Sequence, residues 1–440
     1  MNIRFYNAEI LSMNGNMDVI HGEVWVEGNR ITYVGPERAQ AGCGCQAEKQ
    51  ETSALGYRIP VWDREIDADG SLLMPGFKNA HTHSPMTFLR SYADDLPLLE
   101  WLHRQIFPME AKLQPEHIYW LCKLAIMEYL TSGITSNFDM YMHPEVIAKA
   151  SVDCGFRTVL VSGLNNFTSS LREMEEEYIA LNQYHELIRY CMGFHAEYTC
   201  SEELLKGAAA LAHRYQAPMF AHLSETQAEV AECLGRYGRT PAAFLDSLGM
   251  FEYGGGGYHC IYMNDEDLEI FRSRGLTVVT NPGSNTKLAS GIARTSDMLK
   301  RGITMAIGTD GPASNNCLDM FREMFLVTGL AKLREQDAAA VPADEVLKMA
   351  VTGGARAMGL TDCDCLAEGK LADLIMIDLN QPNMQPINHL VKNLVYSGSK
   401  QNVKLTMVNG RILYEDGRFL IGVEPKEVYR KVQEIIDGMR

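Results

Sequence analysis

The chain has 440 residues, of which 46% are hydrophobic and 22% are charged, a balance that excludes an intrinsically disordered protein. Acidic residues exceed basic residues by 16, and a net charge of this sign repels phosphate backbones and disfavours nucleic acid as a partner. No apolar run reaches the roughly 20 residues that cross a bilayer, and no signal peptide is visible. The eleven cysteines, an odd number without a repeating framework, are typical of reduced thiols. We therefore expect a soluble cytoplasmic protein that binds no membrane.

Short strand-like runs with Gly-containing turns occur near both ends of the chain. They are residues 23–28, 30–35, 372–378 and 404–410. We predict that residues 1–74 and 363–440 together form one small β-sandwich domain. Within it, residues 41–58 are rich in Gly, Cys, Gln and Glu and are expected to form an inserted loop, and residues 425–439 are expected to form a closing amphipathic helix.

The middle of the chain alternates short apolar runs, each followed by polar residues, with helical patterns of about 12 to 20 residues. The runs are residues 72–77, 134–138, 158–161, 190–194, 218–221, 256–258, 276–280 and 303–307. Eight buried strands alternating with helices indicate an α/β fold, a (β/α)8 TIM-like barrel, which we place at residues 75–362. Catalytic groups of such barrels lie at the carboxyl ends of the strands.

Polar side chains that can bind a metal or move a proton follow these runs: His81, His83, His195, His222, His259 and Asp310. His81 and His83 are two positions apart on an extended segment, so both can point toward one ion. Imidazole suits Zn²⁺ or Fe²⁺, and a carboxylate such as Asp310 completes a mixed set of ligands with room for water. An ordinary pair of strand-end histidines is the alternative for His81 and His83 alone. The joint placement of His81, His83, His222 and Asp310 at the ends of strands 1, 5 and 8 favours a metal site.

Glu225 follows His222 by three residues, where a strand is expected to turn into a helix. Its carboxylate could reach over the metal and move protons without binding the ion. The alternative is an acid at a helix start, stabilised by the helix dipole. For His259 the alternative is a hydrogen-bonded histidine of the core.

Five segments together resemble the amidohydrolase superfamily: residues 75–83, 222–225, 258–260, 281–285 and 308–311. The resemblance covers nearly the whole chain. Within the superfamily, the sequence is most similar to deaminases of S-adenosylhomocysteine, methylthioadenosine and related adenosine derivatives.

The resemblance implies metal ligands at four residues: His81, His83, His222 and Asp310. It implies catalytic roles for Glu225 as proton shuttle, and for His259 and Asp310 in orienting and deprotonating the attacking water. Substrate contacts are implied at five residues: Glu100, Trp101, His195, Glu225 and Ser314. Glu100 and Trp101 match the pair that holds the ribose hydroxyls, for which the alternative is an exposed helix-start acid beside a packing Trp.

The chain also departs from this family. Close relatives often carry Arg at the end of strand 3, where this chain has Ser162, which weakens the case for a substrate with a carboxylate tail; Arg172 is a candidate to compensate. Strand 4 ends at His195 without the Lys that bridges two metals in binuclear members, so one divalent ion per chain is expected, Zn²⁺ or alternatively Fe²⁺. Two Cys-x-Cys pairs, at 43–45 and 363–365, could meet in a structural zinc site or disulfides, or could be unrelated thiols.

The expected function is metal-dependent hydrolytic deamination of an adenosine-type nucleoside to the inosine analogue plus ammonia. The candidate substrates are methylthioadenosine, 5′-deoxyadenosine, adenosine and S-adenosylhomocysteine, and a homo-oligomer is expected. The alternative on the same scaffold is a deaminase or chlorohydrolase of another amino-substituted heterocycle, such as guanine or a triazine. A binding protein without activity is a third hypothesis, which predicts loss of a ligand or of Glu225; none is missing.

Overall fold

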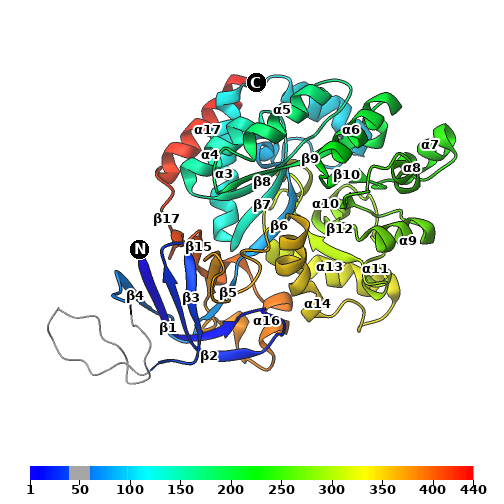
Figure 1. Ribbon diagram of the computed structural model, residues 1–440. Helices are drawn as coiled ribbons and strands as arrows, with labels where there is room; N and C mark the ends of the chain where they lie inside the picture. The colour runs from blue at the N-terminus through cyan, green and yellow to red at the C-terminus, as the bar shows by residue number, and fades with distance from the viewer. Residues whose placement is uncertain (39–59, 97, 440) are drawn as a thin grey trace, which may run out of the picture.

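The computed structural model describes residues 1–38, 60–96 and 98–439, which fold around two sheets (Figure 1). The insertion predicted at residues 41–58, with Cys43 and Cys45, lies outside the described residues. Cys363 and Cys365 are buried and are not disulfide-bonded. No helix in the described part of the chain is both long enough and apolar enough to span a membrane.

The first sheet consists of eight parallel strands in chain order, which confirms the predicted barrel fold. They are β6 (Phe77–Thr82), β7 (Ile134–Met140), β8 (Arg157–Val161), β9 (Ile188–Ala196), β10 (Met219–Leu223), β11 (Gly255–His259), β12 (Thr277–Thr280) and β13 (Thr304–Ile307). Hydrogen bonds join the two outer strands: the backbone N–H of Asp310 donates to the carbonyl oxygen of His81 (3.0 Å), and the Asn79 amide donates to the Thr309 hydroxyl (2.8 Å). Strand β6 is therefore held beside the segment that follows β13.

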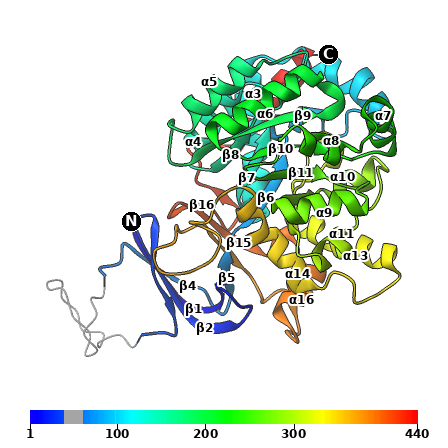
Figure 2. The ribbon, with the colours of Figure 1, turned by 45° about the vertical axis from the view of Figure 1, so that its right-hand side comes forward.

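Helices surround this sheet and form the outer layer seen in Figures 1 and 2. The longer ones are α3 (Pro115–Thr131), α4 (Pro144–Cys154), α5 (Leu171–Leu181), α6 (Glu202–Tyr215), α7 (Gln227–Tyr237), α9 (Asp265–Arg274) and α13 (Met320–Glu335). The shorter ones are α1 (Leu98–Trp101), α2 (Phe107–Glu110), α8 (Pro241–Ser247), α10 (Pro282–Lys287), α11 (Thr295–Lys300), α12 (Pro312–Asn315), α14 (Ala343–Lys348), α15 (Gly354–Ala357) and α16 (Leu390–Tyr396). Two single π-turns, η2 (Leu102–Ile106) and η4 (Met349–Gly353), connect α1 to α2 and α14 to α15. Short 3₁₀ turns are η1 (Ser84–Leu89), η3 (Glu197–Thr199), η5 (Pro382–Met384) and η6 (Lys400–Asn402).

The second sheet is mixed and is built from both ends of the chain, as predicted. Its strands are β1 (Asn2–Leu11), β2 (Val19–Glu27), β3 (Arg30–Gly35), β4 (Arg64–Asp67), β5 (Leu72–Pro75), β14 (Leu374–Ile377), β15 (Val403–Val408), β16 (Arg411–Glu415) and β17 (Arg418–Phe419). The two halves meet where β5 pairs with β14 antiparallel, with Leu374 opposite Pro75. Alternate side chains from both halves, such as Phe5 and Leu405, pack into one hydrophobic core.

The apolar run at residues 72–77, predicted as one barrel strand, is two strands that belong to different sheets. It divides at Gly76, between β5 of the mixed sheet and β6 of the barrel. A Cβ atom at Gly76 would lie 2.1 Å from the Thr135 side chain, so only glycine lets the chain pass so close to β7. The hydrophobic pattern alone does not reveal this break because both strands are buried.

A buried ion pair joins the barrel to the mixed sheet. Arg157, at the start of β8, binds Asp373 through two parallel hydrogen bonds of 2.6 and 3.0 Å, and the backbone N–H of Asn409 also donates to Asp373 (2.7 Å). Burial alone would raise the pKa of Asp373, but the facing guanidinium outweighs it and lowers that pKa. The pair therefore holds the two sheets in register.

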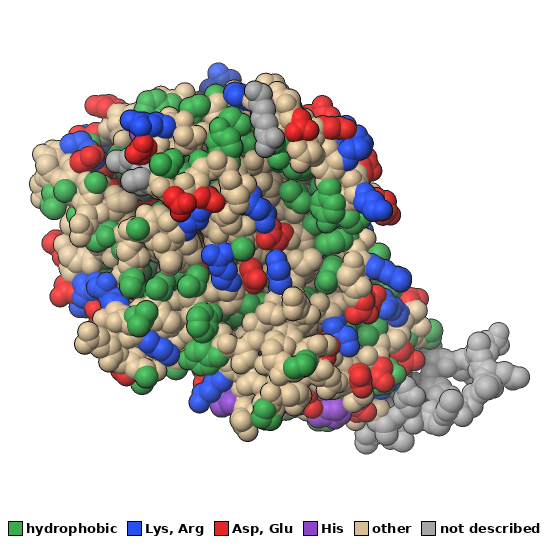
Figure 3. Space-filling view, turned by 180° about the vertical axis from the view of Figure 1, so that it is seen from behind, with side chains coloured by type: hydrophobic (Ala, Val, Ile, Leu, Met, Phe, Trp, Pro, Cys, Tyr) green, Lys and Arg blue, Asp and Glu red, His purple; other side chains and the backbone are tan. Residues whose placement is uncertain are grey.

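The C-terminal helix α17 (Pro425–Met439) forms where it is predicted and packs beside α3 of the barrel layer (Figure 1). The Lys112 ammonium donates to the carbonyl oxygen of Met439 (2.8 Å), and Lys431 lies over the ring of Trp120. On the face turned away from the viewer in Figure 1, acidic and basic side chains are interspersed (Figure 3).

Candidate active site

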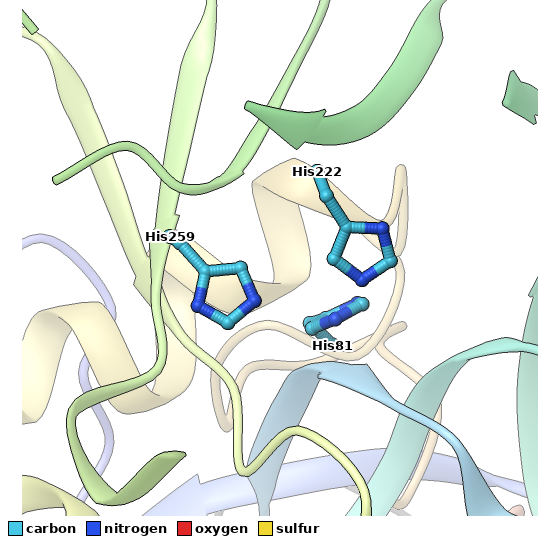
Figure 4. A group of neighbouring side chains, drawn as sticks. All are labelled: His81, His222 and His259. Carbon is cyan, nitrogen blue, oxygen red and sulfur yellow. The ribbon is translucent and has the colours of Figure 1, made fainter. Parts of the chain in front are cut away.

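Three histidines from separate strands point toward one another at the carboxyl end of the barrel. Figure 4 shows the rings of His81 (β6), His222 (β10) and His259 (β11), and one nitrogen of each lies within 4.8 Å of the others. His81 also belongs to a second group with His83 and Asp310, whose ligand atoms lie within 4.8 Å of one another. The six strand-end residues from which the sequence predicted a site include all five of these.

The backbone at this edge is turned so that the side chains face inward. His259 and Asp310 have φ angles of 66° and 59°, in the left-handed region that side chains disfavour. Such a conformation costs on the order of 1–3 kcal/mol and is concentrated at functional sites. The rest of the barrel therefore stabilises a strained arrangement that aims both residues at the cluster.

Hydrogen bonds fix the ring orientations of His83, His222 and His259. In each, Nδ1 contacts an oxygen of a neighbouring element, which leaves Nε2 facing the cluster, the usual arrangement of histidines that bind metals. The pairs are His83 with Met140 O, His222 with His195 O (2.7 Å) and His259 with Asn285 Oδ1 (2.7 Å). Asn285 belongs to the 281–285 segment, for which no role was predicted from the sequence.

His81 lacks such a partner. It is fully buried and stacked on Tyr258 at 3.8 Å, and neither ring nitrogen has a hydrogen bond to any residue that the structure describes. Burial, followed by the neighbouring histidines, holds the pKa of His81 well below its usual value, so the imidazole is neutral. Burying an imidazole whose nitrogens form no hydrogen bond costs folding free energy. The same neutral, unpaired nitrogen is a suitable metal ligand. The residues present therefore fit a divalent metal ion.

Asp310 supplies the negative charge of the cluster. Burial opposes its ionisation, but the close contact with His83 (3.2 Å) and the other histidines lowers the pKa of Asp310 well below its usual value. The Ser314 hydroxyl and the backbone N–H of Gly311 donate to its two oxygens, at 2.8 and 2.7 Å. Ser314, predicted as a substrate contact, is thus also a residue that orients this carboxylate.

Glu225 lies on the open side of the cluster, with its carboxylate 3.9 Å from Nε2 of His259. Burial raises the pKa of Glu225, which favours a carboxyl group that carries a proton. The backbone N–H groups of Ser224 and Glu225 both donate to the Glu229 carboxylate, at 2.6 and 2.8 Å. Sequence reasoning missed Glu229, although Thr226 and Glu229 have the spacing of a helix-capping box.

A cavity of about 900 Å³ opens onto the cluster, a size typical of small-molecule sites. Four of the predicted substrate residues line it: Trp101, His195, Glu225 and Ser314. The structure does not bring Glu100 to them. Its carboxylate is 40% exposed and forms an ion pair with Arg104 one turn further along the chain (2.7 Å).

Glu110, which sequence reasoning missed, lines the cavity at the end of α2. Burial raises the pKa of Glu110, and the nearby Tyr141 hydroxyl and His83 oppose this rise. The π-turn η2 lies between Glu100 and Glu110 and adds a residue to one helical turn, which changes the face that each later side chain occupies. A count of helical positions therefore could not have shown which of these two acids faces the cavity.

Comparisons with known proteins agree with this geometry. Residues 72–413 match the Amidohydrolase family. A protein named 5-methylthioadenosine/S-adenosylhomocysteine deaminase from Caldanaerobacter subterraneus is 38% identical over 99% of this chain and 98% of its own length. One with the same name from Syntrophobacter fumaroxidans is 42% identical over 84% of this chain and 86% of its own.

Solved structures show the same architecture. A zinc-bound adenosine deaminase from Xanthomonas campestris superimposes with a TM-score of 0.90 and 30% identity, over 100% of this chain and 98% of that one. Atrazine chlorohydrolase from Arthrobacter aurescens gives a TM-score of 0.87 over 99% of this chain and 100% of that one. At 20% identity, this second likeness shows the fold alone.

Proposed function

The chain belongs to the amidohydrolase family, and from this premise we propose that it deaminates an adenosine-type nucleoside by hydrolysis. The observation that carries the proposal is the convergence of His81, His83, His222 and Asp310 at the carboxyl end of the barrel, beside a cavity that His83, His222, Asp310 and Glu225 line. The deaminase names of full-length relatives support the same chemistry.

The four residues His81, His83, His222 and Asp310 would hold one divalent ion per chain, zinc in this proposal. Such an ion would act as a Lewis acid and lower the pKa of water from 15.7 to about 7. Three imidazoles and one carboxylate are a ligand set suited to zinc, with Fe²⁺ as the alternative. His195, the penultimate residue of β9, stands in place of a Lys, which supports a single ion.

The remaining residues move protons. Asp310 accepts a proton from the water whose oxygen adds to C6 of the purine, and His259, whose Nε2 lies 3.9 Å from Oδ2 of Asp310, orients that water. Glu225 donates its proton to N1, which makes C6 electrophilic. In the resulting tetrahedral adduct, Asp310 returns its proton to the amino group, the C6–N bond breaks, and ammonia leaves. The hydroxyl proton passes back to Glu225, so both carboxyl groups return to their starting states.

We assign the ribose hydroxyls to Glu110 in place of Glu100. Glu110 lines the cavity together with Trp101, whereas Glu100 is paired with Arg104. A carboxylate accepts hydrogen bonds from two vicinal hydroxyls. Burial lowers the pKa of His195 to about 4, so its ring is neutral and can donate to or accept from the purine.

The test measures the release of ammonia by the zinc-loaded protein from methylthioadenosine, 5′-deoxyadenosine, adenosine, S-adenosylhomocysteine and guanine, and the release of chloride from a chlorinated triazine. We expect turnover of at least one of the adenine nucleosides and none of guanine or the triazine. Absence of ammonia from all the nucleosides, at full metal content, would refute the proposed function.

A further inference from the structure

The cavity continues beyond the metal-binding cluster to the loops that follow β7 and β8 and to helix α5. Three carboxylates belong to this outer end: Glu145 at the start of α4, and Glu173 and Glu177 on α5. None of the described side chains that line the cavity belongs to Lys or Arg. The wall away from the cluster therefore carries negative charge without a matching cation.

Glu177 is the best-placed of these carboxylates. It is half-buried, it accepts a hydrogen bond from the Tyr190 hydroxyl of β9, and both residues line the cavity. Burial raises the pKa of Glu177; the hydrogen bond from Tyr190 and the nearby His143 oppose this rise, and the charges of Glu145 and Glu173 add to it, so both carboxylates repel Glu177. A cation placed among them would relieve that repulsion, and an anion would add to it.

No Lys or Arg side chain among the described residues that line the cavity offsets the negative charge of its outer end. His143 faces Glu145 at 3.3 Å, and the Glu173 carboxylate accepts from the backbone N–H and hydroxyl of Ser170, both at 2.8 Å. Arg172 is 85% exposed, is paired with Glu176 (2.7 Å) and does not line the cavity. Arg172, a candidate to supply the cation that is absent at Ser162, therefore does not reach the cavity in this structure.

The direction of a bound nucleoside follows from the proposed function, on which this step rests. C6 must lie at the cluster, beside Glu225, and the ribose beside Glu110. The 5′ substituent is then left to extend toward α5, because the cavity continues there.

We propose that this outer end is the subsite for the 5′ substituent, and that Glu177 makes it select neutral and positively charged substituents over those that bear a carboxylate. The substrate class is thus an adenine nucleoside whose 5′ group lacks a carboxylate and is either uncharged or positively charged. S-adenosylhomocysteine, whose tail carries a carboxylate beside its ammonium group, lies outside this class and is a poor substrate.

The test compares three 5′-thioadenosines whose sulfur carries an alkyl, an aminoalkyl or a carboxyalkyl chain of equal length. In the wild-type enzyme we expect kcat/KM for the aminoalkyl compound to exceed that for the carboxyalkyl compound by about tenfold or more. Glu177→Gln keeps an oxygen that accepts from Tyr190, so the local fold is retained, and it should reduce this ratio several-fold. The matched control is Glu176→Gln, which removes the same charge from the preceding residue, whose side chain is 61% exposed. It should leave the ratio unchanged.

Two results would overturn the inference: equal or better turnover of the carboxyalkyl compound by the wild type, or an aminoalkyl preference that survives Glu177→Gln. In both cases kcat/KM is compared with that of the alkyl compound, which has no charge on its tail. Turnover of that compound upholds the proposed function even when the inference about Glu177 fails. Absence of turnover for all three overturns both.

Discussion

Replacing Glu110 by Gln is expected to weaken turnover of nucleosides while the fold and the metal ion are retained. Glu110 reaches the cavity wall near His83, and Gln has nearly the same shape but a single acceptor oxygen. A hydrogen bond to a charged group contributes about 1.5–3 kcal/mol net, so the loss of one bond to ribose predicts a fall of about 10- to 150-fold in kcat/KM.

The assay measures kcat/KM for methylthioadenosine together with the inhibition constant of free adenine. Adenine lacks the ribose, so its binding should be unchanged in Glu110→Gln, and the metal content per chain should equal that of the wild type. A loss of equal size for the nucleoside and the free base would show that Glu110 maintains the site rather than binding ribose.

Glu100→Gln is the matched control, since it makes the same chemical change ten residues earlier. Its exposed ion pair with Arg104 is of a kind that contributes less than about 1 kcal/mol, so activity and stability should stay close to the wild type. If Glu100→Gln impaired nucleoside turnover and Glu110→Gln did not, the assignment of the ribose carboxylate would revert to Glu100.

Three further variants test other parts of the structure. Glu225→Gln should keep the metal but lower kcat by about 10²- to 10⁴-fold, because Gln cannot transfer a proton; near-normal turnover would exclude the shuttle. Elemental analysis should find about one metal ion per wild-type chain and less in His81→Ala. An unchanged metal content in this variant would show that His81 is not a ligand. Asp373→Asn should lower the free energy of unfolding by about 3–5 kcal/mol in urea titrations, because Arg157 is left buried without its counter-charge. Since the pKa of Asp373 is lowered from 3.8, its contribution is complete above that pH and lost as pH falls below it; a difference that shrinks between pH 8 and pH 5 would contradict this.

The convergence of the histidines could be predicted from sequence because barrel geometry removes most of the uncertainty about where strand ends lie. Parallel strands in chain order bring their carboxyl ends to one edge, so a histidine that ends β10 must lie near those that end β6 and β11. The positions of His81, His222 and His259 in the chain were therefore enough to expect them together, although 178 residues separate the first from the last.

The break at Gly76 and the choice between Glu100 and Glu110 could not be predicted in this way. At Gly76 two buried strands follow each other without a polar turn, so the hydrophobic pattern does not show that they enter different sheets. Between the two acids, a π-turn changes the helical phase, and no pattern in the sequence marks it. Both features depend on packing against distant segments rather than on local preference.

The type of reaction can be predicted from sequence more readily than the substrate, for the same reason. The residues to which we assign proton transfer lie at or just after strand ends, where the fold determines their position, so a familiar set of residues there indicates the chemistry. The groups that meet the far end of the substrate lie on loops and on the outer helix α5, where Glu177 reaches the cavity through contacts with Tyr190 of another element. Ser162 alone shows only that a cation is missing at the end of β8. That an acid stands nearby follows from the path of α5, and this is why the charge of the preferred 5′ group had to be inferred from the structure.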